Sequence, residues 1–209
     1  MAYEIHILFE GYSRSTEEGM VANCSCTLIK GNKLVIVDTM TPWDKSLIVE
    51  KLDSLGVACD DIDFVVCTHG HSDHTGNNNL FLKAKHIVGY SVSFKNLYFI
   101  HPFETGEPYI IDDNLKIIPT PGHTLADVTV LVNTKDNGLV AVTGDLFECK
   151  EDIADPTIWK YIAGSDDPEK QQQNRSKILE MADWIVPGHG PMFQVTEEIK
   201  SSYKKQLQL

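Results

Sequence analysis

The residues best suited to chemistry are histidines and an aspartate that crowd into one short segment. A strand could not aim four such side chains at one point, because alternate residues of a strand face opposite ways. A tight turn could, and Gly70 and Gly76 permit one. Imidazole nitrogen and carboxylate oxygen are ligands that suit zinc. The segment therefore predicts a metal site built from His69, His71, Asp73 and His74.

Two further histidines occur in a repeated tripeptide. Pro121-Gly122-His123 and Pro187-Gly188-His189 each follow an apolar run that reads as a strand. Thr143-Gly144-Asp145 also stands at the end of such a run, residues 139–142. Four separate strand ends thus deliver residues of metal-ligand type. Unrelated surface histidines would not share this placement, so we interpret all four ends as parts of one metal centre.

The hydrophobic pattern predicts the elements that would carry these residues. The apolar run Phe64–Cys67 reads as a buried strand that leads into the first histidines. Residues 25–29 and 33–37 flank the turn pair Gly31-Asn32, and residues 127–133 and 139–147 flank Asn137-Gly138, so each pair predicts a hairpin. Helices are expected to begin at Thr41-Pro42 and Asp167-Pro168, where a capping residue precedes proline.

Both halves of the chain therefore alternate strands and helices, with ligand residues at strand ends. We expect residues 1–209 to form a single domain in which two mixed β-sheets pack face to face with helices outside. Residues 11–19 are polar and predict a loop, which either overhangs the site or is plain surface. Residues 91–109 carry aromatic side chains without clear periodicity, so they form either satellite core or a substrate-facing segment.

Composition limits the class of protein. The chain has 209 residues, 42% of them hydrophobic, and no apolar run of the roughly 18 residues that a membrane helix needs. The first residues lack the basic and apolar regions of a signal peptide. We interpret the five cysteines as reduced thiols of a cytoplasmic or nuclear protein. A net charge of −12 disfavours nonspecific nucleic-acid binding and an anionic membrane surface.

The ordered row of ligand residues resembles that of the metallo-β-lactamase superfamily. The resemblance covers nearly the whole chain and implies a four-layer αβ/βα sandwich with the site at one edge, between the two sheets. It implies two zinc ions per chain, although imidazole and carboxylate also suit iron and manganese. By this resemblance Asp145 bridges the two ions, the first ion is held by His69, His71 and His123, and the second by Asp73, His74 and His189.

The same resemblance implies a hydrolase whose nucleophile is a hydroxide bridging the metals, oriented by Asp73. Binding to metal lowers the pKa of water from about 15.7 to about 7, so no serine or cysteine nucleophile is needed. Asp38 and Thr68 stand where strands enter the site, and we interpret both as groups that orient ligand imidazoles. The alternative for Asp38 is that it only caps the start of a helix.

Three segments resemble one group within the superfamily, described as zinc-dependent, homodimeric endoribonucleases that process the 3′ ends of histone pre-mRNA. This resemblance implies an RNA substrate and a homodimer. Two alternatives remain open: a glyoxalase II-like thioesterase or lactonase, and an iron persulfide dioxygenase. β-Lactamases of this fold usually place Cys or Ser where Asp145 stands. The three segments are residues 65–77, 144–148 and 182–191.

Overall fold

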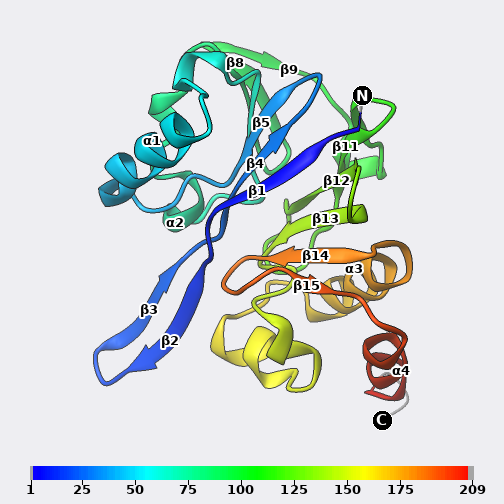
Figure 1. Cartoon of the computed structure of the whole chain (residues 1–209). Helices are drawn as coiled ribbons and strands as arrows, with labels where there is room; N and C mark the ends of the chain where they lie inside the picture. Colours follow the sequence, from blue (N-terminus) through cyan, green and yellow to red (C-terminus); the bar gives the residue numbers. More distant parts are fainter. Residues whose placement is uncertain (1, 207–209) are drawn as a thin grey trace.

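Two mixed β-sheets face each other in the computed structural model, which describes residues 2–206 (Figure 1). The seven-stranded sheet contains, in spatial order, β1 (Glu4–Phe9), β4 (Cys26–Lys30), β5 (Leu34–Val37), β6 (Phe64–Cys67), β7 (Lys85–Val88), β8 (Ser91–Phe94) and β9 (Leu97–Phe99). The six-stranded sheet contains β10 (Tyr109–Asp112), β11 (Leu115–Pro119), β12 (Val128–Thr134), β13 (Gly138–Gly144), β14 (Trp184–Pro187) and β15 (Phe193–Gln194).

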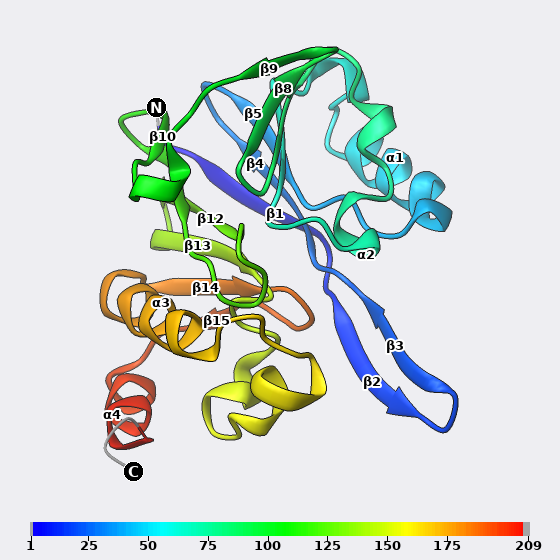
Figure 2. The same cartoon turned by 180° about the vertical axis from the view of Figure 1, so that it is seen from behind.

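Helices cover the outer face of each sheet (Figure 2). The α-helices are α1 (Lys45–Ser54), α2 (Ser72–Thr75), α3 (Pro168–Met181) and α4 (Glu197–Gln206). Short 3-10 helices occur at Pro42–Asp44, Cys59–Asp61, Asn78–Leu80, Phe103–Thr105 and Lys150–Ile153, and a π-helix at Ile158–Ile162. Helix, sheet, sheet and helix make the four layers that the sequence predicted.

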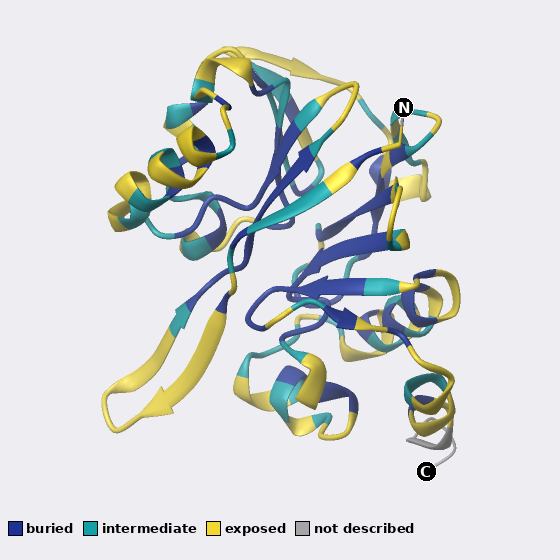
Figure 3. Cartoon of the chain, in the orientation of Figure 1, coloured by how far each residue is buried: buried dark blue, intermediate teal, exposed yellow. Residues whose placement is uncertain are grey.

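Each boundary between layers holds its own apolar core, as the dark central strands of Figure 3 show. Alternation along the strands decides which core a residue joins: Val35 and Val37 face the other sheet, whereas Ile36 faces α1. The core between the sheets also contains Val66, and a third core lies beneath α3 and α4 around Ile178. The sheets are therefore buried on both faces, which explains the near-continuous apolar runs.

Parallel pairing brings the ligand-bearing strand ends to one edge. β5, β6 and β7 pair in parallel, and β13 pairs in parallel with β14. Their carboxyl ends meet at the same edge, as in other parallel arrangements where sites form. The two predicted hairpins are confirmed, since β4 pairs with β5 and β12 with β13 in antiparallel fashion.

The predicted loop at residues 11–19 is wrong. It is part of a two-stranded ribbon, β2 (Tyr12–Thr16) and β3 (Gly19–Asn23), that projects from the sheets (Figure 1). Every residue of β2 is exposed. Apart from Ala22 and Asn23 at the end of β3, the ribbon therefore has no buried face, and without a buried face a strand lacks the apolar alternation that would reveal it.

Residues 91–109 contain strands that the sequence did not indicate, β8, β9 and the start of β10. The aromatic side chains of this segment do not share one environment, and a substrate-facing role for them stays a prediction. Phe103 is buried in the core between the sheets, whereas Tyr98 on the edge strand β9 is 70% exposed. Residues 148–167 contain the 3-10 helix and the π-helix that precede α3.

Two features of the structure concern the cysteines and the helices. All five cysteines are free thiols. Between residues 2 and 206, none of the helices combines the length and the apolar content needed to cross a bilayer.

Candidate metal centre

The site forms where the ends of five strands meet. Asp38 follows β5, the pair Thr68-His69 follows β6, and Asp145 follows β13. The two Pro-Gly-His tripeptides lie at the ends of β11 and β14. A hydrogen bond from the Val128 amide to the Thr68 carbonyl, 2.9 Å, ties the two sheets together at this edge. The short helix α2 then supplies Asp73 and His74.

Three imidazoles converge in the first half of the site. Nδ1 of His71 lies 2.9 Å from Nε2 of His69 and 3.1 Å from Nε2 of His123. Nitrogen ligands placed tetrahedrally around zinc, 2.0–2.1 Å from the ion, lie roughly 3.3 Å from one another. The three nitrogens are therefore spaced closely enough to share one cation.

Asp145 lies between this trio and a second group of ligand-type residues. Its Oδ2 is 3.7 Å from Nε2 of His69 and 3.4 Å from Nε2 of His123, while its Oδ1 is 3.2 Å from Nε2 of His74. In the second group, Oδ2 of Asp73 is 3.9 Å from Nε2 of His74 and 3.8 Å from Nε2 of His189. All seven residues of the predicted row thus meet in one place.

The protein fixes which nitrogen of each imidazole faces the centre. Nδ1 of His123 lies 3.0 Å from the Gly164 carbonyl, and Nδ1 of His189 lies 3.0 Å from the Asn23 carbonyl. A carbonyl can only accept, so each Nδ1 must donate its proton. When either imidazole is neutral, the lone pair of its Nε2 points into the site, which is how proteins orient metal-binding histidines.

Asp38 and Thr68 contact two of the imidazoles. Oδ2 of Asp38 lies 2.9 Å from Nδ1 of His74. The Thr68 hydroxyl donates to the Asp38 carboxylate at 3.0 Å, so its lone pairs face Nδ1 of His69 at 3.2 Å. Asp38 contacts the His turn and caps no helix; its φ of 57° is a left-handed conformation that Asp tolerates better than most residues.

Unpaired buried atoms indicate that the site suits cations. Among the described residues, Nε2 of His74 and Oδ1 of Asp145 are buried without a well-formed hydrogen bond, and their close polar contact is with each other, at 3.2 Å. Burying polar groups without well-formed hydrogen bonds is costly in a protein interior. A cation accepts electron pairs from both, so the donor set and the unpaired atoms fit bound metal.

In the metal-free protein the pKa values of the imidazoles are shifted in opposite directions. Burial lowers the pKa of His69 well below its ordinary value, and the neighbouring His74 adds to the effect. Burial is the largest single effect and opposes the charged form of His74 and His189, but Asp145 together with Asp38 for His74, and with Glu148 for His189, outweighs it. The pKa of His74 is therefore raised well above the ordinary value and that of His189 to about 9.

These shifts predict that metal binding releases protons. Because both pKa values are raised, we expect His74 and His189 to be protonated in the metal-free protein at pH 7.5, so a cation must displace a proton from each. We expect calorimetric titration with zinc in buffers of different ionisation enthalpy to show one proton released from each imidazole. Because protons compete with the cation, the apparent affinity should rise from pH 7 towards pH 9. A binding heat that is the same in all buffers would contradict this prediction.

The family of the chain follows from comparison with known proteins. A model of the Metallo-beta-lactamase superfamily matches residues 19–189. The chain belongs to the metallo-beta-lactamase superfamily. The matched residues include all seven members of the ligand row, so the site described above lies inside the matched region of this metallo-beta-lactamase protein.

Curated relatives support the finer resemblance. Metallo-beta-lactamase domain-containing protein 1 of Xenopus laevis is 42% identical over 92% of this chain and 82% of its own length. The human protein of that name is 39% identical over 78% of this chain, and the chain spans 60% of its length. A probable metallo-hydrolase of Methanocaldococcus jannaschii is 32% identical over 74% of this chain and 70% of its own length. The chain is a metallo-hydrolase of the metallo-beta-lactamase superfamily.

Solved structures confirm the fold. The mono-zinc form of the metallo-beta-lactamase FIM-1 from Pseudomonas aeruginosa superposes with a TM-score of 0.64 at 20% identity, covering 98% of this chain and 92% of that one. A quorum-quenching N-acyl homoserine lactone lactonase gives a TM-score of 0.65 at 18% identity, with 91% and 92% covered. The predicted metallo-β-lactamase fold is therefore correct.

Besides Asp38 and Thr68, two buried acidic residues lie beside the ligands, and the sequence analysis did not single them out. Asp127 is buried and accepts hydrogen bonds from the amides of Gly122, 3.1 Å, and Thr124, 2.7 Å, which holds the turn around His123. Glu148 is buried beside His189. The one signal for Glu148 was its position, an acidic residue three places after Asp145, and this signal is weak without coordinates.

Gly188 lies so close to the Asp145 carboxylate that a larger residue at this position would test the metal centre. A Cβ at Gly188 would lie 1.9 Å from Oδ1 of Asp145, so Gly188→Ala must displace that carboxylate. We expect zinc affinity, measured by competition with a chelator, to fall roughly 10–100-fold. Gly70→Ala is the matched control, because its Cβ meets nothing within 4 Å although it lies between two ligands. Equal zinc affinities of Gly188→Ala and Gly70→Ala would contradict the prediction.

Proposed function

We propose that the chain is a dinuclear zinc hydrolase that cleaves phosphodiester bonds in RNA. His69, His71 and His123 would hold one cation, Asp73, His74 and His189 the other, and Asp145 would contact both. The observation that carries this proposal is the position of the Asp145 carboxylate, with Oδ1 3.2 Å from His74 and Oδ2 3.4 Å from His123. When bound, paired cations activate water and stabilise negative charge that develops on the attacked group.

The protein residues would perform separate tasks around these cations. Asp38 and the carbonyls that face Nδ1 atoms fix the imidazoles, so the site needs little rearrangement to bind metal. Asp73 would orient the attacking water. Its side chain is 19% exposed, against 6% for Asp145, so it can accept a hydrogen bond from a water that enters from solvent. Exposed His71 marks the open side of the site.

RNA as the substrate is supported by the resemblance of three segments to histone pre-mRNA endoribonucleases. The net charge of −12 weighs against broad binding of nucleic acid, so we expect recognition of a short RNA segment near the metals rather than of a long phosphate track. Lactone hydrolysis is the second candidate. It is favoured by similarity to the N-acyl homoserine lactonase of Bacillus cereus, 28% identical over 57% of this chain and 52% of that protein.

A substrate panel with the zinc-loaded protein separates these candidates. The panel contains a single-stranded RNA oligonucleotide, bis-p-nitrophenyl phosphate, S-lactoylglutathione and an N-acyl homoserine lactone. We expect cleavage of the RNA and of the phosphodiester, lost on chelation and restored by zinc. Turnover of the lactone or thioester alone would replace the phosphodiester proposal with the second candidate. No turnover of any substrate by protein that carries two metals would contradict both.

We also propose a homodimer, found in the cytoplasm or nucleus. The free thiols fit a reducing compartment. β9 is an edge strand with exposed Leu97, Tyr98 and Phe99, and an exposed apolar edge of this kind is usually covered by a partner. Light scattering at micromolar concentration should give twice the chain mass. A monomer at that concentration would overturn this part of the proposal.

A further inference from the structure

Glu148 is a buried carboxyl beside the metal centre that lies outside the seven-residue row. It is 3% exposed, and its Oε2 lies 4.0 Å from Nε2 of His189. One ligand atom from each of Glu148, Asp145 and His189 lies within 4.8 Å of the others. The second carboxylate oxygen, Oε1, is buried without a hydrogen-bond partner. The side chain is therefore directed at the same space as two residues that the proposed function assigns to metal.

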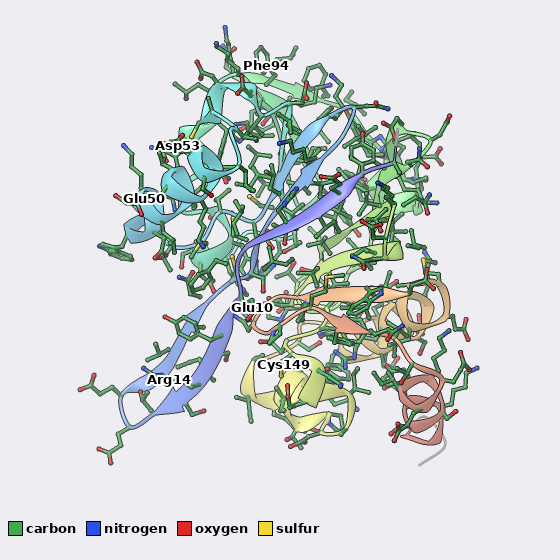
Figure 4. The ribbon with its side chains drawn as sticks, in the orientation of Figure 1. Glu10, Arg14, Glu50, Asp53, Phe94 and Cys149 are labelled. Atoms are coloured by element: carbon green, nitrogen blue, oxygen red, sulfur yellow. The ribbon has the colours of Figure 1, made fainter. Side chains whose placement is uncertain are left out.

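The backbone of Glu148 is held from both sides. Its amide donates to Oδ2 of Asp152 at 2.7 Å, and its carbonyl accepts from the His189 amide at 2.7 Å. Asp152 is itself held by Arg175, at 2.6 Å. Cys149, labelled in Figure 4, follows directly where the chain leaves the site for residues 150–163. The position of Glu148 is thus fixed by the fold.

The buried Glu148 carboxylate has few positively charged groups near it in the described part of the chain. Within residues 2–206, His189 is the only basic side chain that lies within 4.0 Å of its carboxylate. The nearby Arg175 directs its terminal nitrogens to Asp152 and to the Leu146 carbonyl. A buried carboxylate is costly unless it is paired or coordinates a metal. A cation bound by His189 and Asp145 would supply that partner.

We propose that Glu148 is a protein ligand of the second cation, and that it makes this position prefer a harder ion than the first. The proposal rests on the proposed function. The first position offers three imidazole nitrogens and the Asp145 carboxylate, a donor set that suits zinc. With Glu148, the second position offers three carboxylates and the imidazoles of His74 and His189. Carboxylate-rich sets favour Mn²⁺ relative to imidazole-rich ones.

Binding of Mn²⁺ to the full chain tests this assignment without any assay of activity. Metal-free protein is loaded with one equivalent of Zn²⁺ and titrated with Mn²⁺, and bound manganese is measured by electron paramagnetic resonance. We expect the wild-type protein to bind one Mn²⁺, and Glu148→Gln to weaken that binding roughly 10–100-fold while zinc at the first position is unchanged. Glu151→Gln is the matched control, since it removes an exposed carboxylate from the same segment.

The outcomes separate this inference from the proposed function. If the wild-type protein binds two metals and Glu148→Gln binds Mn²⁺ as tightly, the role of Glu148 is overturned and the dinuclear site stands. If the wild-type protein binds less than one metal, both fall. Should the variant fail to fold, a crystal structure of manganese-loaded wild-type protein decides. A Glu148 oxygen within roughly 2.5 Å of the anomalous peak supports the assignment, and one beyond hydrogen-bond distance overturns it.

Discussion

Asp145→Asn is expected to lower kcat of the zinc-loaded protein about 10³-fold, the upper range for loss of one electrostatic group from an active site. The carboxylate lies between both sets of ligands, 3.4 Å from Nε2 of His123 and 3.2 Å from Nε2 of His74. It is also the negative charge that holds the pKa of His189 at about 9. An amide keeps the shape but loses the charge, so cations at both positions would be held less tightly.

Initial rates on bis-p-nitrophenyl phosphate, together with metal content by mass spectrometry, measure the effect. Asp136→Asn is the matched control, because Asp136 is exposed in the turn that leads into β13, the strand that ends at Asp145. We expect the control to keep wild-type kcat and two metals per chain. An Asp145→Asn protein with full activity would show that the two ligand sets do not work as one centre.

Arg175→Met is expected to cost about 3–5 kcal/mol of stability, the usual result of removing one partner from a buried ion pair. Arg175 and Asp152 are both fully buried and lie 2.6 Å apart. The guanidinium also packs 4.1 Å from the ring centroid of Phe147 and 5.0 Å from that of Trp159. Methionine keeps apolar contact with these rings but leaves the Asp152 carboxylate buried and unpaired.

Urea unfolding measures this loss, and thermal unfolding should show a fall in Tm on the order of 10 °C for a chain of this size. Lys177→Met is the matched control. Lys177 is an exposed cation on the same helix, α3, so its replacement should change stability by less than about 0.5 kcal/mol. Similar Tm values for both variants would contradict a structural role for the buried pair.

The ion pair of Arg175 and Asp152 also affects the metal centre. It anchors α3, and α3 holds the two turns that carry His123 and Asp145. Arg175 donates to the Leu146 carbonyl at 2.7 Å, and Gln171 donates to the Asp145 carbonyl at 3.0 Å. Asn174 donates to the Pro121 carbonyl at 2.8 Å, next to the turn of His123. We therefore interpret α3 as the element that sets the distance between His123 and Asp145.

The sequence alone determined the four-layer fold and the row of ligand-type residues. Strands buried on both faces, such as β6 and β13, must be apolar throughout, so they leave an unmistakable run in the sequence. Turn chemistry at Gly31-Asn32 and Asn137-Gly138 is also local, and it correctly placed both hairpins. Ligand residues directly after such runs could be recognised because strand and ligand adjoin in the chain.

Only the tertiary structure decided what depends on contacts between distant residues. The strands β2 and β3 pair with each other, and all of β2 and most of β3 is exposed, so the sequence carries no local apolar pattern that would indicate them. The direction of the Glu148 carboxyl depends on Asp152 and His189, 4 and 41 positions away in the chain. The tautomers of His123 and His189 depend on carbonyls of Gly164 and Asn23. Such effects arise when strands from both halves meet, since hydrogen bonding and burial act through space and not along the chain.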